Sequence, residues 1–66
     1  MINFNIFYEE IESILSPVNQ EIATEFKRQT LTKQPKEVYL WCSANLKFMG
    51  NNRLDEVLRD FYYSVR

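Results

Sequence analysis

The residues that interrupt helices most strongly are rare in this chain and spread along it. Pro17 and Pro35 are the only prolines, and Gly50 is the only glycine, among 66 residues. Proline fits the first turn of a helix but not its interior, and glycine commonly follows a helix C-terminus. The stretches between these positions are 14 to 17 residues long. Each stretch therefore has the length of one short helix.

The residues beside these interruptions set the expected helix boundaries. Residues 16–17 (Ser-Pro) and 34–35 (Gln-Pro) each match an N-cap followed by proline at the first helical position. Gly50 matches the residue just past a helix C-terminus, and Asn51 or Asn52 matches the next N-cap. We therefore expect an all-α fold, a compact bundle of four short helices with the third one central. The expected single domain covers residues 1–66, with helices at 4–15, 17–30, 35–49 and 53–65.

Apolar residues recur with helical spacing in the first, second and fourth predicted helices. The residues expected to face the core are Phe4, Phe7, Tyr8, Ile11, Ile14, Leu15, Val18, Ile22, Ala23, Phe26, Leu54, Val57, Leu58, Phe61 and Val65. Ile2, Phe4 and Ile6 also alternate with polar residues as in a strand. No second strand is available to pair with them, so we favour a helix there.

The third predicted helix differs because it is apolar almost all round. Val38, Tyr39, Cys42, Leu46 and Met49 cover one side, and Leu40, Trp41, Ala44 and Phe48 cover most of the other. Such a helix has to be enclosed. Either the other three helices pack around it, or one of its sides meets a second chain.

Chain length limits how the domain can be stabilised. A chain of 66 residues buries only about 60% of its unfolded surface. Cys42 is the only cysteine and there is no histidine, so neither an internal disulfide nor a cysteine–histidine metal site is available. Oligomerisation or partner binding is the remaining common source of stability. A homodimer is therefore one expectation.

Charge is sorted along the chain. The first 26 residues hold five acids and no base, whereas the remaining 40 hold eight bases and four acids. Part of this pattern matches the helix macrodipole, since acids open and bases close the second and fourth helices. The remaining acids are Glu9, Glu10 and Glu12. They either pair internally with the lysines at positions 33, 36 and 47 or face a partner with a basic surface.

Nothing in the sequence matches a catalytic, metal or cofactor motif. Cys42 has no histidine to activate it and lies among apolar residues, so we interpret it as a small buried hydrophobe. The carboxylates at positions 9 and 12, and at 21 and 25, are spaced as on solvated helix faces. We expect a chain that is not an enzyme and that has no cofactor.

We interpret the chain as a small protein–protein interaction module, a regulator, adaptor or inhibitor of a larger protein. Aromatic and long apolar side chains are enriched at binding surfaces. The expected partner-binding residues are Glu9, Glu10, Glu12, Leu40, Trp41, Phe48 and Tyr63. The composition is typical of short phage or mobile-element proteins.

A helical DNA-binding regulator is the alternative function. Its nucleic-acid contacts would be Lys27, Arg28, Lys33, Lys36 and Lys47. Acidic residues on the fourth helix and a pI near 5.3 weigh against this alternative.

The expected location is the cytoplasm, without a membrane partner. The first residues lack the basic segment and cleavage site of a signal peptide, and no apolar run approaches the ~20 residues of a membrane span. A lone cysteine suits a reducing compartment.

Overall fold

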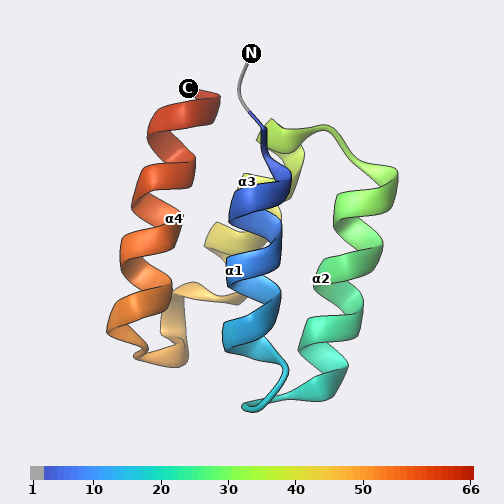
Figure 1. The fold of residues 1–66 in the computed structure, drawn as a ribbon, viewed down its shortest axis with the longest axis vertical. Helices are drawn as coiled ribbons and strands as arrows, with labels where there is room; N and C mark the ends of the chain where they lie inside the picture. The colour runs from blue at the N-terminus through green and yellow to red at the C-terminus, as the bar shows by residue number, and fades with distance from the viewer. Residues whose placement is uncertain (1–2) are drawn as a thin grey trace.

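Four α-helices and one short 3₁₀-helix follow one another in the computed structural model, which describes residues 3–66 (Figure 1). They are α1 (Asn5–Leu15), α2 (Gln20–Thr32), α3 (Pro35–Asn45), the 3₁₀-helix η1 (Lys47–Met49) and α4 (Asn52–Val65). The predicted four-helix bundle is confirmed. None of the helices in this part of the chain is both long and apolar enough to cross a membrane. Met1 and Ile2, which entered the signal-peptide and strand arguments, lie outside the described residues.

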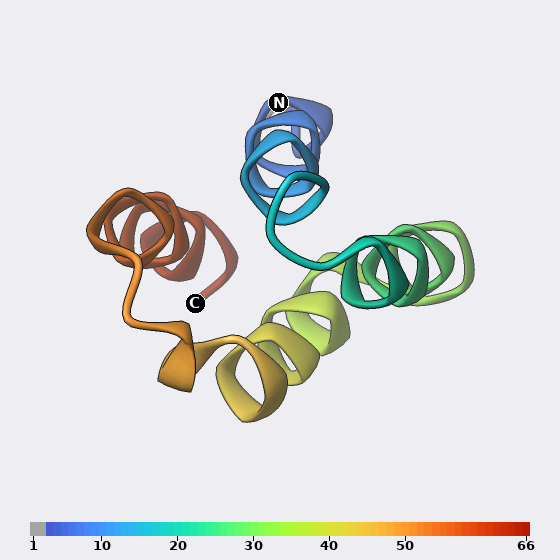
Figure 2. The ribbon, with the colours of Figure 1, turned by 90° about the horizontal axis from the view of Figure 1, so that it is seen from below.

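The helices form a four-membered ring around the core. Each helix packs on the next one along the chain, and α1 packs on α4 to close the ring. Figure 2, an end-on view, shows α1 and α3 on opposite sides, with α2 and α4 between them. The outward faces of α1 and α3 therefore point in opposite directions.

The sequence predicted that the third helix is central, and this prediction is wrong. α3 packs on α2 and α4, but α1 lies across the ring from it. Leu40 is exposed on its outward side, and Phe48 is exposed in η1, just beyond its end. In a ring of four helices each helix has two neighbours, so none is enclosed on all sides. The apolar outward side of α3 is consequently left uncovered.

Helix α2 begins three residues later than the Ser-Pro pair suggested. Ser16 keeps helical dihedrals and its amide donates to the carbonyl oxygen of Glu12 at 2.9 Å, so it continues the end of α1. The N-cap of α2 is Asn19, whose side-chain oxygen accepts a hydrogen bond from the amide of Ile22 at 3.2 Å. Pro17 lies in the intervening turn, where its missing N–H costs no helical hydrogen bond.

The third α-helix ends at Asn45, earlier than predicted. The Asn45 side-chain amide donates to the carbonyl oxygen of Trp41 at 2.9 Å, a local bond of the kind that competes with continued helix. The chain then tightens into η1 and reaches Gly50 at φ 67°. A side chain at Gly50 would meet no atom within 4 Å, so the left-handed backbone is what calls for glycine there.

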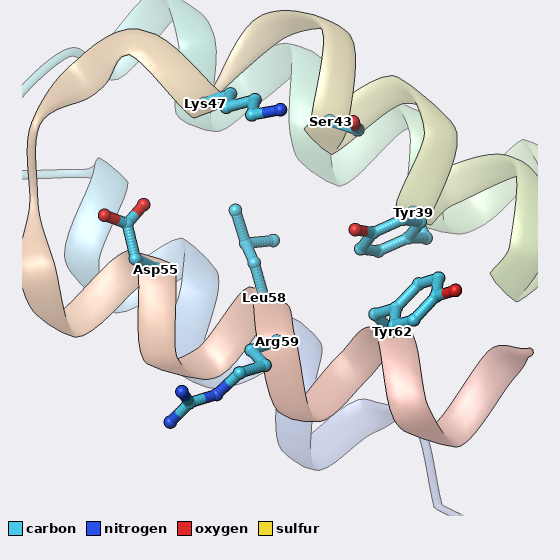
Figure 3. Close-up of a pocket in the computed structure, with 7 residues that line it drawn as sticks. All are labelled: Tyr39, Ser43, Lys47, Asp55, Leu58, Arg59 and Tyr62. Carbon is cyan, nitrogen blue, oxygen red and sulfur yellow. The ribbon is translucent and has the colours of Figure 1, made fainter.

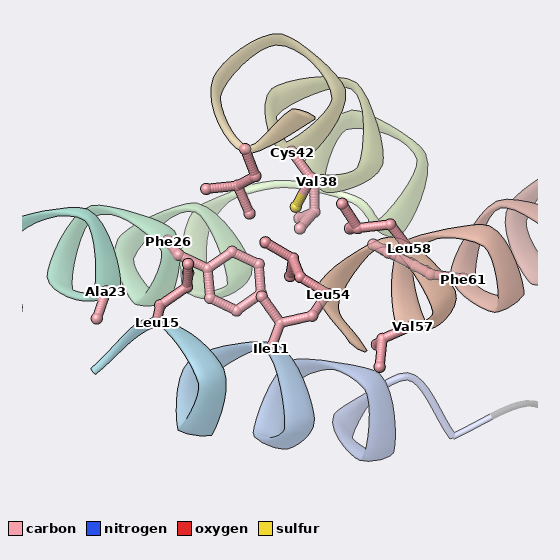
Figure 4. Close-up of a cluster of buried hydrophobic side chains, with 11 residues drawn as sticks. Ile11, Leu15, Ala23, Phe26, Val38, Cys42, Leu54, Val57, Leu58 and Phe61 are labelled. Carbon is pink, nitrogen blue, oxygen red and sulfur yellow. The ribbon is translucent and has the colours of Figure 1, made fainter. Parts of the chain in front are cut away.

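The core draws on all four α-helices and contains no buried polar or charged side chain among the described residues. Figure 4 shows it as a cluster in the middle of the ring. Its members are Ile11, Leu15, Ala23, Phe26, Val38, Cys42, Leu46, Leu54, Val57, Leu58 and Phe61.

Two fully buried rings connect helices that are distant in the sequence. The ring of Phe61 on α4 lies 5.5 Å from that of Phe7 on α1 and 5.7 Å from that of Tyr39 on α3. The ring of Phe26 on α2 lies 6.1 Å from that of Trp41 on α3. Tyr8 on α1 touches both buried rings, edge-on, at 5.8 and 6.0 Å. These aromatic contacts connect helices that lie on opposite sides of the four-helix ring.

Truncating the central side chains should severely destabilise the domain. Phe61→Ala, Phe26→Ala and Ile11→Ala each remove a side chain that is 0% exposed, so each should lower the free energy of unfolding by about 3–5 kcal/mol. Ile6→Ala is the control, because Ile6 is 60% exposed and should cost less than about 0.5 kcal/mol. Urea denaturation measures all four. Unchanged unfolding midpoints for the three core variants would show that the core assignment is wrong.

The cap of α4 gives a second prediction. The side-chain oxygen of Asn51 accepts a hydrogen bond from the amide of Leu54 at 3.0 Å, whereas Asn52 is the first helical residue. Asn51→Ala should therefore lower the free energy of unfolding by about 1 kcal/mol, and Asn52→Ala should leave it nearly unchanged. Equal effects of the two substitutions in thermal or urea melts would contradict this cap.

Candidate interaction surface

The third helix carries two apolar rows, and the fold uses one of them. The buried row, with no exposed surface, consists of Val38, Cys42 and Leu46. The exposed apolar residues, which we call the α3 crest, are Leu40 and Ala44 on α3 and Phe48 in η1, just beyond the end of α3. Within α3, Leu40 and Ala44 are each offset by two residues from Val38 and Cys42, about 200° around the helix, so they lie on the opposite side. Leu40 is 59% and Phe48 is 87% exposed.

A shallow groove of about 240 Å³ runs along one flank of the crest, between α3 and α4 (Figure 3). Leu58 points into it, and the rings of Tyr39 and Tyr62, whose centroids lie 5.3 Å apart, close one end. Lys47 and Asp55 lie toward the other end. Its lining residues are Tyr39, Ser43, Lys47, Asp55, Leu58, Arg59 and Tyr62.

The other flank of the crest meets α2 in a second open groove. It is lined by Glu21, Ile22, Glu25, Trp41 and Asn45. Trp41 is half-buried because its ring also packs against Phe26 in the core. Trp41 therefore contacts the core and also lines the surface groove, whereas Phe48 is exposed on the surface. The crest is thus a convex ridge with a groove on each side.

The acids predicted as partner-binding residues lie on α1, on the opposite side of the bundle from the crest. Glu9 is exposed, while Glu10 and Glu12 are partly exposed. Glu10 lies 3.6 Å from the guanidinium of Arg53 on α4. Within residues 3–66 no ion pair joins these acids to the lysines at 33, 36 or 47. The internal pairing considered from the sequence is therefore replaced by this single contact with α4.

Tyr63 lies near the C-terminal end of α4, next to Tyr62 of the α3–α4 groove but outside the lining of that groove. It is 58% exposed, its ring packs on that of Tyr62 at 5.6 Å, and the guanidinium of Arg66 lies 4.9 Å from the ring centroid. Local contacts account for its position. The expected partner-binding residues therefore divide into the crest with Trp41, the acidic side of α1, and Tyr63.

The basic residues of the nucleic-acid alternative fall in two parts of the chain. Lys27, Arg28, Lys33 and Lys36 belong to α2, its C-cap and the first turn of α3, whereas Lys47 lies in η1. Arg28 pairs with Glu25 at 2.7 Å, and the hydrogen bonds from Arg28 and Gln29 hold the pKa of the Glu25 carboxyl below its ordinary value. Lys27 and Lys33 are exposed at the end of α2. The exposed charges of α4 are mixed: Asp55, Glu56 and Asp60 are exposed, and so are Arg53 and Arg59.

The described residues hold no arrangement typical of a reaction centre. No group of three or more Cys, Asp or Glu side chains in this part of the chain converges as a metal site would. Ser43 and Lys47 share the α3–α4 groove, but no hydrogen bond joins their side chains and Lys47 is exposed. Burial raises the pKa of the Cys42 thiol to about 12, so this sulfur stays protonated.

Sequence reasoning did not select three residues of this surface as partner-binding. Ala44 lies in the middle of the crest, and Tyr39 and Tyr62 form the end of one groove. The spacing of four that joins Ala44 to Leu40 and Phe48 was visible in the sequence. The sequence did not show which apolar side of the helix faces outward.

Comparisons with protein-family models, with curated proteins and with solved structures found no match.

Alkylation of Cys42 tests whether its thiol is buried or reactive. Iodoacetamide at pH 8 should alkylate the folded protein negligibly and the urea-unfolded protein rapidly, because only the unfolded thiol ionises in this range. The pKa of this thiol is higher in the folded state than its ordinary value of 9.0, so the folded state holds the proton more tightly. Stability should therefore fall as pH rises from about 9 toward about 12. Rapid alkylation of the native chain, followed by mass spectrometry, would contradict the buried state.

Proposed function

We propose that this chain is a non-enzymatic protein-binding module that docks on another chain through the α3 crest. The observation that carries the proposal is the second apolar row of α3, which the fold leaves uncovered. A regulator, adaptor or inhibitor is the kind of protein that needs such a surface and no reaction centre.

The exposure of the crest supports this proposal. Phe48 is 87% exposed although phenylalanine is usually among the buried residues, and Leu40 is exposed eight positions earlier, on α3. Single exposed apolar residues are ordinary, but contiguous apolar patches mark interaction sites more often. Aromatic anchors of this kind also carry much of the energy at protein interfaces.

The shape of the crest favours a protein partner over a small molecule. Small ligands bind in concave pockets that bury most of their surface. The crest is instead a convex helical ridge, and the grooves on its flanks are open. A helical ridge fits the groove of another protein, where its side chains at spacings of four act as anchors.

The acidic side of α1 is a second candidate surface, for a partner with a basic surface. Glu9 and Glu12 have no ion-pair partner within residues 3–66 and lie on the opposite side of the bundle from the crest. Charges of this kind accelerate encounter with a basic surface more than they add affinity. A partner bound at the crest would leave these acids accessible.

Polar substitution on the crest should remove binding without unfolding the chain. Leu40→Gln with Phe48→Gln should weaken capture of partner chains by about 30-fold or more, since losing a central anchor costs about 2 kcal/mol or more. Ile6→Gln is the matched control, because Ile6 is 60% exposed, like Leu40 at 59%, but lies on α1. Immobilised wild type, crest variant and control are incubated with native extract, and the bound proteins are quantified by mass spectrometry.

Support requires proteins that are captured by the wild type and the Ile6→Gln control but lost with the crest variant. Circular dichroism melts of the three proteins should coincide, because both crest side chains are exposed. Identical capture profiles for all three proteins would overturn the proposal that the crest is the binding surface.

A further inference from the structure

We infer that the groove between α3 and α4 binds a free α-amino acid with an aromatic side chain. This inference goes beyond the proposed function, because it assigns a small ligand to the groove and leaves the crest to a protein partner. Three features of the groove support it: an apolar floor, a pair of aromatic rings at one end, and two charges of opposite sign at the other end.

The apolar part of the groove suits one aromatic ring. Leu58 points into the groove and forms its floor, and the rings of Tyr39 and Tyr62 stand at one end with their centroids 5.3 Å apart. Tyr62 is 41% exposed, so part of its side chain is free to contact a ligand. Aromatic rings pack on one another at centroid distances of about 4.5–7 Å. A third ring can therefore join this pair and cover Leu58.

The size of the groove limits the ligand to a small molecule. Its volume is about 240 Å³, whereas pockets for drug-sized ligands commonly have about 300–1,000 Å³. Asp55 and Tyr62, at the two ends of the groove, are seven residues apart on α4, which is about 10 Å along the helix axis. This length leaves room for one ring and the short chain that carries its charged groups.

The other end of the groove presents one cation and one anion. Lys47 in η1 and Asp55 on α4 lie there, and the Lys47 side chain is directed along the groove toward Ser43 (Figure 3). Both charged side chains are exposed, and among the described residues neither takes part in an ion pair. A ligand carboxylate would bind Lys47, and a ligand ammonium group would bind Asp55. An α-amino acid carries both groups on the carbon that bears its side chain.

The other two polar residues of the groove have different parts. Ser43 lies between Lys47 and Tyr39 along the groove, so its hydroxyl can donate to the same ligand carboxylate. Arg59 also lines the groove, but its guanidinium points away from it in Figure 3. Arg59 is therefore a matched control for Lys47, as a second exposed cation at the edge of the groove.

The opposite charges favour a zwitterion over ligands with one charge. An aromatic carboxylate would meet Lys47 but would also be repelled by Asp55, and an aromatic amine would have the reverse problem. The zwitterion gains both contacts. Because both protein charges are exposed and screened by water, each contact should change the affinity by about threefold rather than by orders of magnitude.

Titration with L-phenylalanine tests this site, by two-dimensional ¹H–¹⁵N NMR of the full chain. A ligand with so few atoms should bind with a Kd on the order of 1 mM. Expected are saturable shifts of the Leu58 and Tyr62 amides, without matching shifts of the Trp41 amide at the groove toward α2. Two analogues test the charges, since 3-phenylpropionate lacks the ammonium group and phenethylamine lacks the carboxylate. Each should bind about threefold more weakly than L-phenylalanine.

Substitutions identify the groups that read the ligand. Asp55→Asn should remove the preference for L-phenylalanine over 3-phenylpropionate, and Lys47→Gln should remove the preference over phenethylamine. The control Arg59→Gln should keep both preferences. Tyr62→Ala should weaken the binding of all three compounds, whereas Tyr63→Ala, which changes an exposed tyrosine outside the groove lining, should not. All of these side chains are exposed, so the variants should keep the wild-type fold, which the same spectra check.

Each outcome supports or overturns a defined part of the inference. Absence of saturable shifts at concentrations well above the expected Kd overturns the ligand site. Equal binding of the three compounds by the wild type shows that the groove accepts only the ring, and overturns the amino acid as its ligand. Unchanged preferences in both Asp55→Asn and Lys47→Gln overturn the assignment of the charges. Capture of a protein partner at the crest is measured separately, so failure here is distinct from failure of the proposed function.

Discussion

The packing of two fully buried phenylalanine rings holds this small bundle together. Phe61 joins α4 to α1 and α3, and Phe26 joins α2 to α1 and α3. Tyr8 touches both rings, so helices on opposite sides of the ring are connected through the core. A chain this short has few side chains to bury, and large aromatic rings remove the most apolar surface per residue.

A ring of four helices also determines what remains outside. Each helix can bury only the side that faces the centre and its two neighbours. For α1 and α4 the outward sides are mostly polar, which suits solvent. For α3 the outward side carries Leu40, so the same arrangement that completes the core exposes Leu40 together with Phe48 in η1. The candidate site is thus a direct consequence of an apolar helix placed at the edge of a ring.

Charges play a local role in the structure. Glu25 and Arg28 pair within one turn of α2, and Glu10 reaches Arg53 on the neighbouring helix. Among the described residues, Glu10 with Arg53 is the one ion pair between different helices, so pairing between the acidic and basic parts of the chain is limited to this contact. What remains of the acid-to-base order along the chain is the acidic side of α1, opposite the crest.

The sequence alone determined the number of helices, most of their apolar faces and the identity of the central side chains, because local spacing and capping residues act within a few positions. It also placed the α4 cap at one of two asparagines, but put the start of α2 three residues early, since a Ser-Pro pair resembles a cap even in a turn. Only the tertiary structure decided which apolar row of α3 is buried. Both rows have the same helical spacing, and packing against α2 and α4 selects the row of Val38 and Cys42 for the core. The exposed apolar residues are left as a surface that no other helix covers.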